Sequence, residues 1–552
     1  MLVYGDHREL AGTAERLGDL RGQLARVAEA PAGLDRHGKL VAALIEAGRL
    51  LQGVADADFA ERGHDRRTEA ADALGEWVCA LARAVCRSWT SGFEETGDIP
   101  QPPRLPAVPA ELELRLPEGF AFYAVYPEAY LEAARRLVVA APARVIGIRS
   151  IGTTLGAVVA AALGAPPPTT VRPFGAPFAR QIAVAPELAR ELLARGVHYV
   201  IVDEGPGQSG SSFGAVADWL QERGVPLDRI AFIPSHPGDV GPEASDATRR
   251  RWRKAQRVPA QFDARWLEAR FGPLEEFSSG HPFAMRKFLS RGTGRAMLLK
   301  FAGLGAIGER KLAMARALHR AGLTPEPLGL VHGFLVERWR DDAAPLARGE
   351  KPLAEIARYI AARAQLFPAG AGEGAPLARL QQMIRRNVCL ALGEDAARAL
   401  DCWEPGLERL ERRVVRVRTD NRLDRQEWLR VPGGALLKAD ALDHHLAHDL
   451  VGCQDMAWDV AGAAVEFSLS EAEAAELIRL TERASARPVE PDLLQFYRLA
   501  YLAFRVGREH LAARLSPESG PIHADEQRYR NALRELVLER TPSATRPESL
   551  VG

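Results

Sequence analysis

The stretch "HYVIVDEGPGQSGSSFGAV" (residues 198–216) joins a short apolar run to small residues and then to a helical pattern. An apolar run of this length is typical of a strand buried on both faces of a parallel sheet. Asp203 and Glu204 follow it directly, and Gly, Pro, Gln and Ser fill the next eight positions. Backbone amides at the beginning of a helix can bind a phosphate. The stretch therefore predicts either a turn in an ordinary parallel sheet or a phosphate-binding loop.

Two further apolar runs lie on either side of it, "ARVIGIR" at 143–149 and "RIAFIPS" at 229–235, and helical patterns separate the three. Strands that alternate with helices form a parallel sheet covered on both faces. Ligands of such sheets bind beyond the carboxyl ends of the strands. We therefore expect an α/β domain over residues 118–240, with its site at the residues that end these runs.

The rest of the chain divides into segments of different character. Helical periodicity comes first and a run of prolines follows it. After the α/β domain come a polar connection, two strands joined by a glycine turn, and then mainly helices. The predicted fold class is a multidomain chain of α/β and α+β parts. The parts follow in this order: a helical N-terminal domain (1–99), a Pro-rich linker (100–117), the parallel-sheet domain (118–240), a connecting segment (241–275), a small lobe (276–345), a helical lobe (346–540) and a disordered tail (541–552).

The composition argues against several classes of partner. Lys plus Arg and Asp plus Glu both total 72, so no long-range field attracts nucleic acid or an anionic membrane. The basic stretch "TRRRWRKAQR" (248–257) is read as the solvated face of a connecting helix. No apolar run reaches the ~18 residues of a membrane span, and the first residues lack a signal pattern. The five cysteines form no CxxC pair. We expect a cytoplasmic protein with small-molecule ligands, without nucleic-acid or membrane partners; its oligomeric state is unknown.

The acids after the 198–202 run suggest a sugar phosphate as ligand. A phosphate bound at the glycine-rich loop places an attached sugar over the strand end, where Asp203 and Glu204 can accept hydrogen bonds from a cis-diol and help bind Mg²⁺. A P-loop for nucleoside triphosphates carries Lys in GxxxxGK[ST], and this loop has none.

Four apolar residues, two acids, a small-residue stretch and Ser-Gly-Ser resemble the phosphoribosyl pyrophosphate motif of the type I phosphoribosyltransferases. The resemblance covers about 118–240. It implies that Asp203 and Glu204 hold the ribose hydroxyls in the catalytic site. It also implies a set of residues around the 5′-phosphate: Gly207, Gln208, Ser209, Gly210, Ser211 and Ser212.

Other segments fit the same resemblance. "VRPFGAPFARQI" (171–182) lies where the family has a mobile flap, and Ser235 with His236 would face the acceptor. A second strand–turn–helix supplies the residues of the family's pyrophosphate loop, here Arg149, Ser150, Gly152 and Thr153. The sequence departs from the family at Glu204, Pro206 and Gln208, which leaves the substrate open. A glycine-rich turn in an unrelated parallel sheet remains the alternative.

A second candidate site lies in the last half of the chain. Gly303, Gly305 and Gly308 have GxGxxG spacing, but the preceding strand is paired through a tight turn, which argues against a dinucleotide fold. Phosphoryl transfer needs a Lys on the phosphates, a Glu that holds it, an Asp beside the acceptor hydroxyl and an Asp on Mg²⁺. The chain offers these in the expected order, as Lys300, Glu309, Asp420 and Asp440.

Residues 276–515 resemble the aminoglycoside phosphotransferase and choline kinase group, through "GLTPEPLGLVHGFLVERW", "RTDNRLDRQEW", "LLKAD" and "DMAWDVAGAAVEF". The resemblance implies a bilobal protein-kinase-like fold with ATP as phosphoryl donor. Asp420 is then the catalytic base and Asp440 the Mg²⁺ ligand. Lys300 and Glu309 form the pair that holds the phosphates, and the segment from Glu337 to Trp339 is the adenine edge.

Two positions depart from this group. Arg425 stands where the group has a metal-binding Asn, and Arg418 where it has His; Asn421, Asp424 or Gln426 are possible substitutes for the Asn. The mismatch leaves a pseudokinase open. In "DHHLAHD" (443–449), His444 and His448 could also bind zinc with Asp443 and Asp449, but we favour a role for His444 in supporting an acid or facing the substrate.

Together these features predict a bifunctional transferase. One site uses phosphoribosyl pyrophosphate or a related nucleotide, and the other transfers phosphate from ATP to a small-molecule hydroxyl, with Mg²⁺ at both. A nucleoside-like metabolite is one candidate acceptor. The alternative is a non-catalytic, nucleotide-sensing regulator with a pseudokinase domain.

Overall fold

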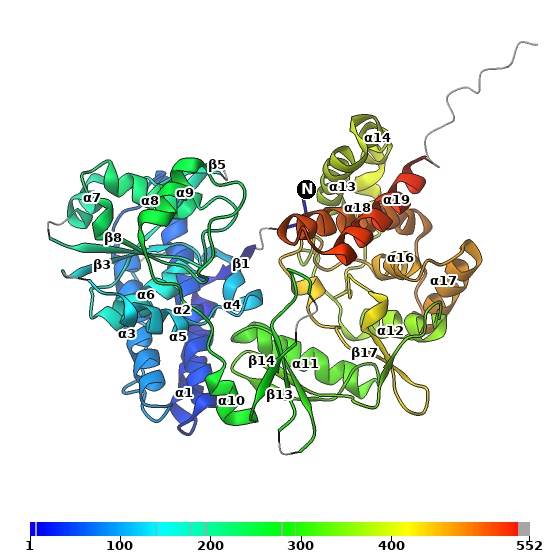
Figure 1. Cartoon of the computed structure of the whole chain (residues 1–552), viewed down its shortest axis with the longest axis horizontal. Coiled ribbons are helices and arrows are strands. Elements are labelled where there is room, and N and C mark those ends of the chain that lie inside the picture. The colour runs from blue at the N-terminus through cyan, green and yellow to red at the C-terminus, as the bar shows by residue number, and fades with distance from the viewer. Residues whose placement is uncertain are drawn as a thin grey trace, which may run out of the picture.

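The computed structural model describes residues 1–5, 8–106, 108–139, 141–176, 178–193, 196–277, 280–292 and 294–538. The predicted tail at 541–552 lies outside these residues. The chain forms two halves that lie side by side (Figure 1). The first half holds a parallel sheet and the helices around it, and the second holds an antiparallel sheet and a helical lobe. In the described residues, every helix is too short or too polar to cross a membrane.

The first half begins with three helices, α1 (Thr13–Glu29), α2 (Leu34–Arg62) and α3 (Glu69–Thr90). The sequence predicted that these helices form a separate domain, but they do not. Helices α2 and α3 pack against α6 (Gly152–Leu163) of the parallel-sheet region and share its hydrophobic core. Gly48 of α2 leaves no space for a side chain beside Thr154 of α6. Helix α6 therefore lies between the parallel sheet and the pair α2 and α3, and α1 packs against α2.

The predicted linker 100–117 contains a strand. Strand β2 (Glu111–Arg115) pairs antiparallel with β1 (Arg8–Gly12), and its residues Leu112 and Leu114 are buried against α2. The alternation of Glu and Leu in this strand has the period of two that places one face on a core. The linker prediction is thus wrong for the part after the prolines.

The parallel sheet has the order β4-β3-β7-β8-β9, and all its neighbouring strands are parallel. The predicted connecting segment 241–275 supplies the edge strand β9, so it belongs to this domain. Its basic helix buries Trp252, which stacks on Phe232 of the sheet. A short hairpin, β5 with β6, lies in the predicted flap segment. The bounds are β3 (Ala143–Ile148), β4 (Thr169–Val171), β5 (Phe174–Ala176), β6 (Ala179–Gln181), β7 (His198–Val202), β8 (Ile230–Ile233) and β9 (Gln256–Arg257).

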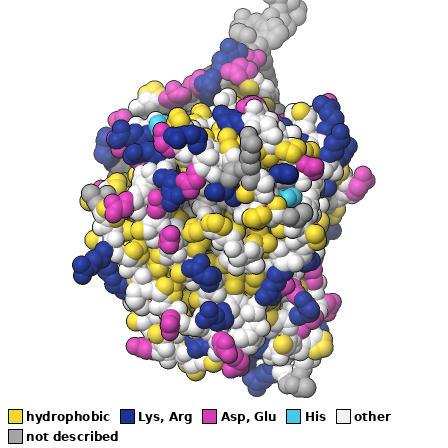
Figure 2. Space-filling view, turned by 90° about the vertical axis from the view of Figure 1, so that its left-hand side faces the viewer, with side chains coloured by type: hydrophobic (Ala, Val, Ile, Leu, Met, Phe, Trp, Pro, Cys, Tyr) yellow, Lys and Arg dark blue, Asp and Glu magenta, His cyan; other side chains and the backbone are white. Residues whose placement is uncertain are grey.

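Short helices complete the first half. Figure 2 views the molecule from the side of this half, and basic and acidic side chains are interspersed there, as the balanced charge predicts. The helices are α4 (Glu118–Phe122), α5 (Pro127–Arg136), α7 (Pro186–Leu192), α8 (Ser211–Gln221), α9 (Asp246–Lys254) and α10 (Arg265–Phe271).

The second half begins with an antiparallel sheet of order β10-β11-β12-β14-β13. The strands joined by the glycine turn, β11 and β12, pair as the sequence predicted. One helix, α11 (Ala306–Arg320), follows β12 and contacts β13 and β14. The strands are β10 (Leu274–Glu276), β11 (Lys287–Ser290), β12 (Met297–Phe301), β13 (Pro327–Val331) and β14 (Phe334–Arg338).

The helical lobe surrounds a small three-stranded sheet of order β15-β16-β17. Residues 1–5 also belong to this lobe: Val3 is in its core, and the backbone N–H of Leu450 donates to the carbonyl of Val3. The elements are β15 (Ala344–Pro345), α12 (Leu353–Leu366), α13 (Leu377–Leu392), α14 (Glu394–Arg398), α15 (Leu407–Glu411), β16 (Trp428–Arg430), β17 (Leu436–Lys438), α16 (Met456–Glu466), α17 (Glu471–Ser485), α18 (Pro491–Leu515) and α19 (Gly520–Leu538).

Candidate active site

Three lysines and two aspartates meet where the antiparallel sheet faces the helical lobe; we call them the lysine–aspartate centre (Lys287, Lys300, Lys311, Asp440 and Asp443). Lys300 Nζ lies 2.5 Å from Asp440 Oδ1 and 2.7 Å from Asp443 Oδ2. Lys287 is directly opposite Lys300 in the β11–β12 pair, and its Nζ lies 3.2 Å from Asp440 Oδ2. Two like charges placed opposite each other repel, and Asp440 compensates them.

The predicted partner of Lys300, Glu309, is not at this centre. Glu309 is exposed and lines a cavity of about 120 Å³ together with Gly305 and His332. The residue of α11 that faces the centre is Lys311, which is buried and whose Nζ lies 2.6 Å from Asp443 Oδ1. Two positions correspond to about 200° around a helix, so the two side chains leave α11 on opposite sides.

The predicted adenine edge divides between two environments. Glu337 of β14 is buried near Lys300, and burial raises its pKa to about 7 although Lys300 opposes this shift. Trp339 lies beyond the strand, where its indole N–H donates to Asp341 and its ring contacts Phe277 edge-on. Glu337 therefore belongs with the buried charges and Trp339 with the surface loop.

Asp420, the predicted base, is buried beside the centre. Tyr359 donates its hydroxyl proton to Oδ2, His444 Nδ1 lies 3.0 Å from Oδ1, and Lys438 Nζ lies 3.5 Å from Oδ2. Burial alone would raise the pKa of Asp420, but Lys438, His444 and Arg363 outweigh it and lower the pKa below its ordinary value. The carboxylate is therefore ionised, and each oxygen has at least one partner.

The backbone around Asp420 is fixed by Asp459 of α16. The backbone N–H groups of Asp420 and Asn421 donate to its two oxygens at 2.8 and 2.9 Å. Asn421 has φ +69° and donates through its side chain to the carbonyl of Gly452 at 2.7 Å. Asp459 and Asn421 thus hold the loop, which leaves the Asn421 amide engaged away from the centre.

The residue at the position of the metal-binding Asn and its other two proposed substitutes do not take that role either. Arg425 donates to the carbonyl of Glu350, Asp424 pairs with Arg505 at 2.7 Å, and Gln426 is exposed. The same loop instead brings in Glu427, which sequence reasoning missed. It lies 2.5 Å from Lys438 Nζ, and burial raises its pKa to about 8. Its signal was only that it is the next carboxylate after the expected position.

Glu427, Asp440 and His444 bring their ligand atoms within 4.8 Å of one another. Carboxylate oxygens suit Mg²⁺ and an imidazole suits transition metals. The pair His444 and His448 does not form the alternative zinc site. His448 Nε2 instead lies 3.0 Å from Glu118 Oε1, and its ring stacks on Tyr4. Asp440 is thus placed among residues that can hold a divalent cation.

A second cluster lies at the carboxyl ends of the parallel strands; we call it the sheet-edge site (Asp203 to Ser212, Ser235 and His236). Burial raises the pKa of Asp203 to about 7 and that of Glu204 to about 8, with Glu118 adding to the latter. Gly207 and Gly210 have φ +59° and +65°, which a glycine adopts without strain. Helix α8 begins at Ser211, as the loop prediction required.

The neighbouring loops reach this edge as well. Ser235 and His236 both lie next to Gly205, and the backbone N–H of Ser235 donates to the carbonyl of Glu204 at 2.5 Å. Arg180 of the β5–β6 hairpin lies 3.4 Å from the Ser212 hydroxyl. The predicted acceptor residues and flap therefore surround the acids, whereas Gln208 is exposed at the rim.

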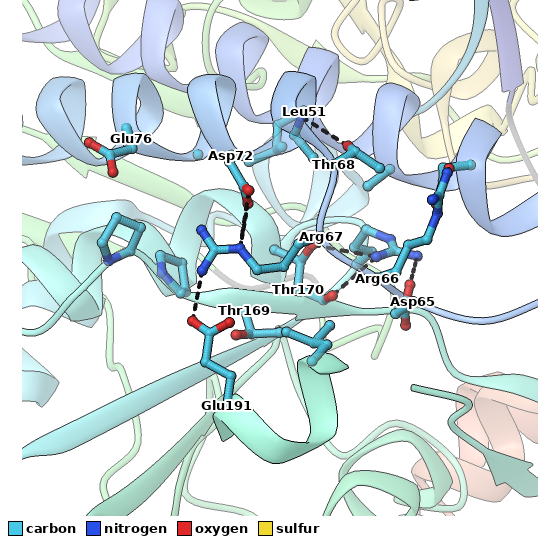
Figure 3. A pocket seen from close by; sticks show the side chains of 18 of the residues that line it. Leu51, Asp65, Arg66, Arg67, Thr68, Asp72, Glu76, Thr169, Thr170 and Glu191 are labelled. Carbon is cyan, nitrogen blue, oxygen red and sulfur yellow. Dashed lines mark hydrogen bonds and ion pairs between the residues drawn. The ribbon is translucent and has the colours of Figure 1, made fainter. Parts of the chain in front are cut away.

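Arg149 does not have the position expected of a pyrophosphate ligand. Its guanidinium donates to Asp56 Oδ1 at 2.9 Å and to Asp65 Oδ1 at 2.5 Å, both from the α2 region. It lines a cavity of about 300 Å³ that Arg67, Asp72 and Glu191 also line (Figure 3). This residue is an ion-pair anchor between the sheet and the N-terminal helices.

The rest of the predicted pyrophosphate loop is close-packed. Gly152 lies so near the carbonyl of Val202 that an added Cβ would stand 2.6 Å from its oxygen. Thr153 is fully buried, and its hydroxyl has no hydrogen-bond partner among the described residues. Ser150 is half-buried, and its carbonyl accepts the backbone N–H of Thr153. Gly152 therefore serves the contact between α6 and β7.

The two sites are joined by helix α4. Glu118 pairs with His448 of the second half, while its neighbour Gly119 lies next to the Glu204 carboxylate. The backbone N–H of Leu304, beside β12, donates to the carbonyl of Phe120 at 2.9 Å. Phe122, at the end of the same helix, has its ring 5.9 Å from Lys311 Nζ, so one short helix contacts both candidate sites.

No family model and no curated protein matches the chain. Among solved structures, choline kinase LicA from Streptococcus pneumoniae is similar over 50% of this chain and 97% of its own, with 18% identity and a TM-score of 0.36. A choline/ethanolamine kinase family protein from Mesorhizobium loti covers 48% and 88%, with 20% identity and a TM-score of 0.33. A thermostable mutant of aminoglycoside phosphotransferase APH(4)-Ia covers 51% and 100%, with 15% identity and a TM-score of 0.34.

These similarities concern about half of the chain and proteins named as kinases or phosphotransferases, the group that the sequence of residues 276–515 resembles. TM-scores of this size do not by themselves support an inference about function, so the functional proposal relies on the geometry of the lysine–aspartate centre. The phosphoribosyltransferase resemblance of residues 118–240 stays a prediction.

Proposed function

We propose that the second half is an ATP-dependent phosphotransferase that acts on a hydroxyl group of a small molecule. The observation that carries this proposal is the convergence of Lys300, Asp440 and Asp420 from separate segments. Lys300 contacts Asp440 directly, and Lys438 connects the two acids, since its Nζ donates to the carbonyl of Asp440 and lies 3.5 Å from Asp420. Phosphoryl transfer needs these charges close together.

Each residue of the proposed site has a role that follows from its charge. Lys300 and Lys287 neutralise the phosphates of ATP. Asp420, ionised and oriented by Tyr359 and His444, accepts the proton of the acceptor hydroxyl. Asp440 and Glu427 would hold Mg²⁺ through their carboxylate oxygens. When bound, this ion supplies neutralisation of the charge that develops on the transferred phosphoryl group.

The test is phosphate transfer from radiolabelled ATP, with Mg²⁺, to a panel of nucleosides and other small hydroxyl compounds. Asp420→Asn should lower the rate by roughly 10²–10⁴-fold, the usual contribution of a catalytic acid–base group. Asp395→Asn, at an exposed carboxylate of α14, is the matched control and should leave it unchanged. An Asp420→Asn variant with full activity contradicts the assignment of the base.

The competing function is a nucleotide-sensing regulator. It is favoured by Arg425, which stands where a metal-binding Asn is expected, and by the occupied oxygens of Asp420. The same experiment separates the two: ATP binding without transfer to any compound, measured on the unmodified chain, supports the regulator.

We further propose that the sheet-edge site binds phosphoribosyl pyrophosphate or a related ribose phosphate together with Mg²⁺. The observation that favours it is the pairing of two acids, whose pKa values are raised by burial, with a loop of small residues at the beginning of α8. Calorimetric titration with phosphoribosyl pyrophosphate should give Mg²⁺-dependent binding that Asp203→Asn weakens. Asp228→Asn, at an exposed site before β8, is the control. No binding to the unmodified chain would refute this assignment.

A further inference from the structure

A buried cluster of two histidines and one glutamate joins three distant segments. His37 lies in α2, Glu128 in α5 and His332 in the turn between β13 and β14. Glu128 Oε1 lies 2.6 Å from His37 Nε2 and 2.9 Å from His332 Nε2. The side chains of His37, Glu128 and His332 are 0%, 3% and 2% exposed. None of the three belongs to the lysine–aspartate centre or to the sheet-edge site.

The Glu128 carboxylate carries its charge in mainly aromatic surroundings. The rings of Trp89 and Phe93 face His37, and those of Tyr126 and Trp266 face His332. Among the described residues, Glu128 Oε2 has no hydrogen-bond partner. A buried carboxylate with one unsatisfied oxygen is costly unless a cation balances it.

The backbone of His332 is strained. This residue has φ +41° and precedes Gly333 with φ +89°, so both central positions of the β13–β14 turn are left-handed. Such turns favour Asn, Asp or Gly at the first position, and a bulkier residue there costs energy. The hydroxyl of Tyr126 donates to the carbonyl of His332 at 2.8 Å and holds the turn. The result is that an imidazole, where Asn would fit better locally, reaches Glu128.

The second nitrogen of His37 is also fixed. His37 Nδ1 lies 2.9 Å from the hydroxyl of Ser88 in α3. When Nδ1–H donates to this oxygen, Nε2 presents its lone pair toward Glu128. Two lone pairs facing each other at 2.6 Å require a cation or a proton between them. A hydrogen bond from the far nitrogen is the arrangement that orients histidine ligands of metals.

We propose that His37, Glu128 and His332 bind a divalent transition-metal ion, with zinc as the expected ion. Two imidazoles and a carboxylate form a common donor set for zinc, and Glu128 Oε2 can complete four-coordination. With bonds of about 2.0–2.1 Å, neighbouring ligand atoms of a tetrahedral ion lie roughly 3.3 Å apart. To reach this spacing, Glu128 Oε1 needs to separate from His37 Nε2 by about 0.7 Å and from His332 Nε2 by about 0.4 Å.

The surroundings favour zinc in a structural role. The site is closed by protein, which suits a metal without redox chemistry and without an open position. A cavity lined by Gly38 and His332 lies beside the cluster. A bound ion would connect α2 and α5 of the first half to the β13–β14 turn of the second, and so fasten the two halves together.

The test is the metal content of the full chain, purified without a histidine tag, supplied with zinc and then desalted. Plasma mass spectrometry should find bound zinc that His37→Ala and Glu128→Gln both lose. His444→Ala, in the other cluster, and His523→Ala, on the surface, should retain it. Replacement by Co²⁺ should give the visible absorption of a tetrahedral ion, which the same two variants lose.

A measurement on the unmodified chain removes the dependence on variants that fold poorly. Extraction with dipicolinate should lower Tm by several degrees, and added zinc should restore it. If a different first-row metal is found in the same molar ratio to the chain as expected for zinc, the site is supported and that metal is its ion. A chain that binds only trace metal, with a Tm that neither dipicolinate nor zinc changes, overturns the proposal, because hydrogen bonds alone would then hold the cluster.

Discussion

The lysine–aspartate centre and the sheet-edge site both contain paired acids, but they treat the charge in opposite ways. At the centre, Asp440 has two lysines in direct contact, and these lower its pKa although burial opposes them. At the sheet edge, Asp203 and Glu204 are neighbours, and burial raises the pKa of both. At the centre, lysines already neutralise the aspartates, so a ligand must replace some of these ion pairs. At the sheet edge, two carboxyl groups lie together without such neutralisation, so they need a bound cation to ionise readily.

The largest effect is expected from breaking the neutralised network at Lys300. Lys300→Met leaves Asp440 and Asp443 with fewer cations in a buried place, which typically costs about 3–5 kcal/mol. Denaturant unfolding should show this loss. Lys300→Met combined with Asp443→Asn should recover part of it, because one uncompensated charge is then removed. An unchanged midpoint in the single variant would mean that the charges of the centre are not coupled.

The next effect concerns the proposed metal ligands. Glu427→Gln removes one carboxylate that we expect to hold Mg²⁺, so the Mg²⁺ concentration for half-maximal transfer should rise by roughly 10–100-fold. Glu404→Gln is a control in the same lobe, at an exposed side chain. If Glu427→Gln and Glu404→Gln reached half-maximal transfer at the same Mg²⁺ concentration, Glu427 would not be a Mg²⁺ ligand.

The sheet-edge site should show a dependence on pH that the centre lacks. Since the pKa values of Asp203 and Glu204 are raised to about 7 and about 8, their charged forms dominate only above these values. Binding of Mg²⁺ and phosphoribosyl pyrophosphate should therefore weaken as pH falls, by at least about tenfold between pH 8 and 6, which is the effect of Asp203 alone. Titration calorimetry at both values measures it. Affinity that is flat over this range would show that the acids do not bind the cation.

A smaller effect of the opposite sign is expected for stability. Asp203 is charged in the folded protein only above about pH 7, whereas its ordinary pKa is 3.8, so the wild-type chain loses stability as pH rises between these values. Asp203→Asn has no such loss and should be more stable at pH 8, by no more than the ~4 kcal/mol that the full separation of the two pKa values would give. At pH 3 the wild-type chain and Asp203→Asn should unfold at the same denaturant concentration. If Asp203→Asn were less stable than the wild-type chain at pH 8, the ionised Asp203 carboxylate would not be destabilising.

The smallest effect belongs to a surface ion pair and sets the scale for the others. Arg67 contacts Asp72 and Glu191, but its side chain is 54% exposed (Figure 3). Arg67→Ala should therefore cost less than ~1 kcal/mol, and salt should reduce that cost further. Thermal unfolding at low and high ionic strength is the measurement. If Arg67→Ala lost as much stability as Lys300→Met, the difference in solvent exposure would not explain how much each ion pair contributes.

Local patterns in the sequence predicted most of the sheets. The apolar runs at 143–149, 198–202 and 229–235 contain parallel strands, because a strand buried on both faces needs apolar residues at every position. The strand Glu111–Arg115 had its own signal in the alternating "ELELR", but the prolines before it favoured a linker. Its partner lies about a hundred residues away, which no local pattern contains.

The sites were predictable as far as residue types at strand ends allow. Lys300, Asp420 and Asp440 do come together, but the choice between Glu309 and Lys311 depends on how α11 is rotated against its sheet. Arg149 ends a strand as expected, yet its partners come from a helix almost a hundred residues earlier in the chain. Helix rotation and distant ion pairs are set by packing of the whole molecule.

The contact of residues 1–5 with the helical lobe has a consequence for folding. Leu2 pairs with Asn387 and Val3 with Leu450, so the first of these contacts spans 385 residues and the second spans still more. During synthesis at ≈ 5–20 residues per second, the segment emerges long before its partners and must wait tens of seconds for them. The parallel sheet can form in that interval, whereas residues 1–5 cannot bind until this part of the helical lobe has been synthesised. Contacts of this sequence separation form slowly, and the order of synthesis thus sets the order of assembly.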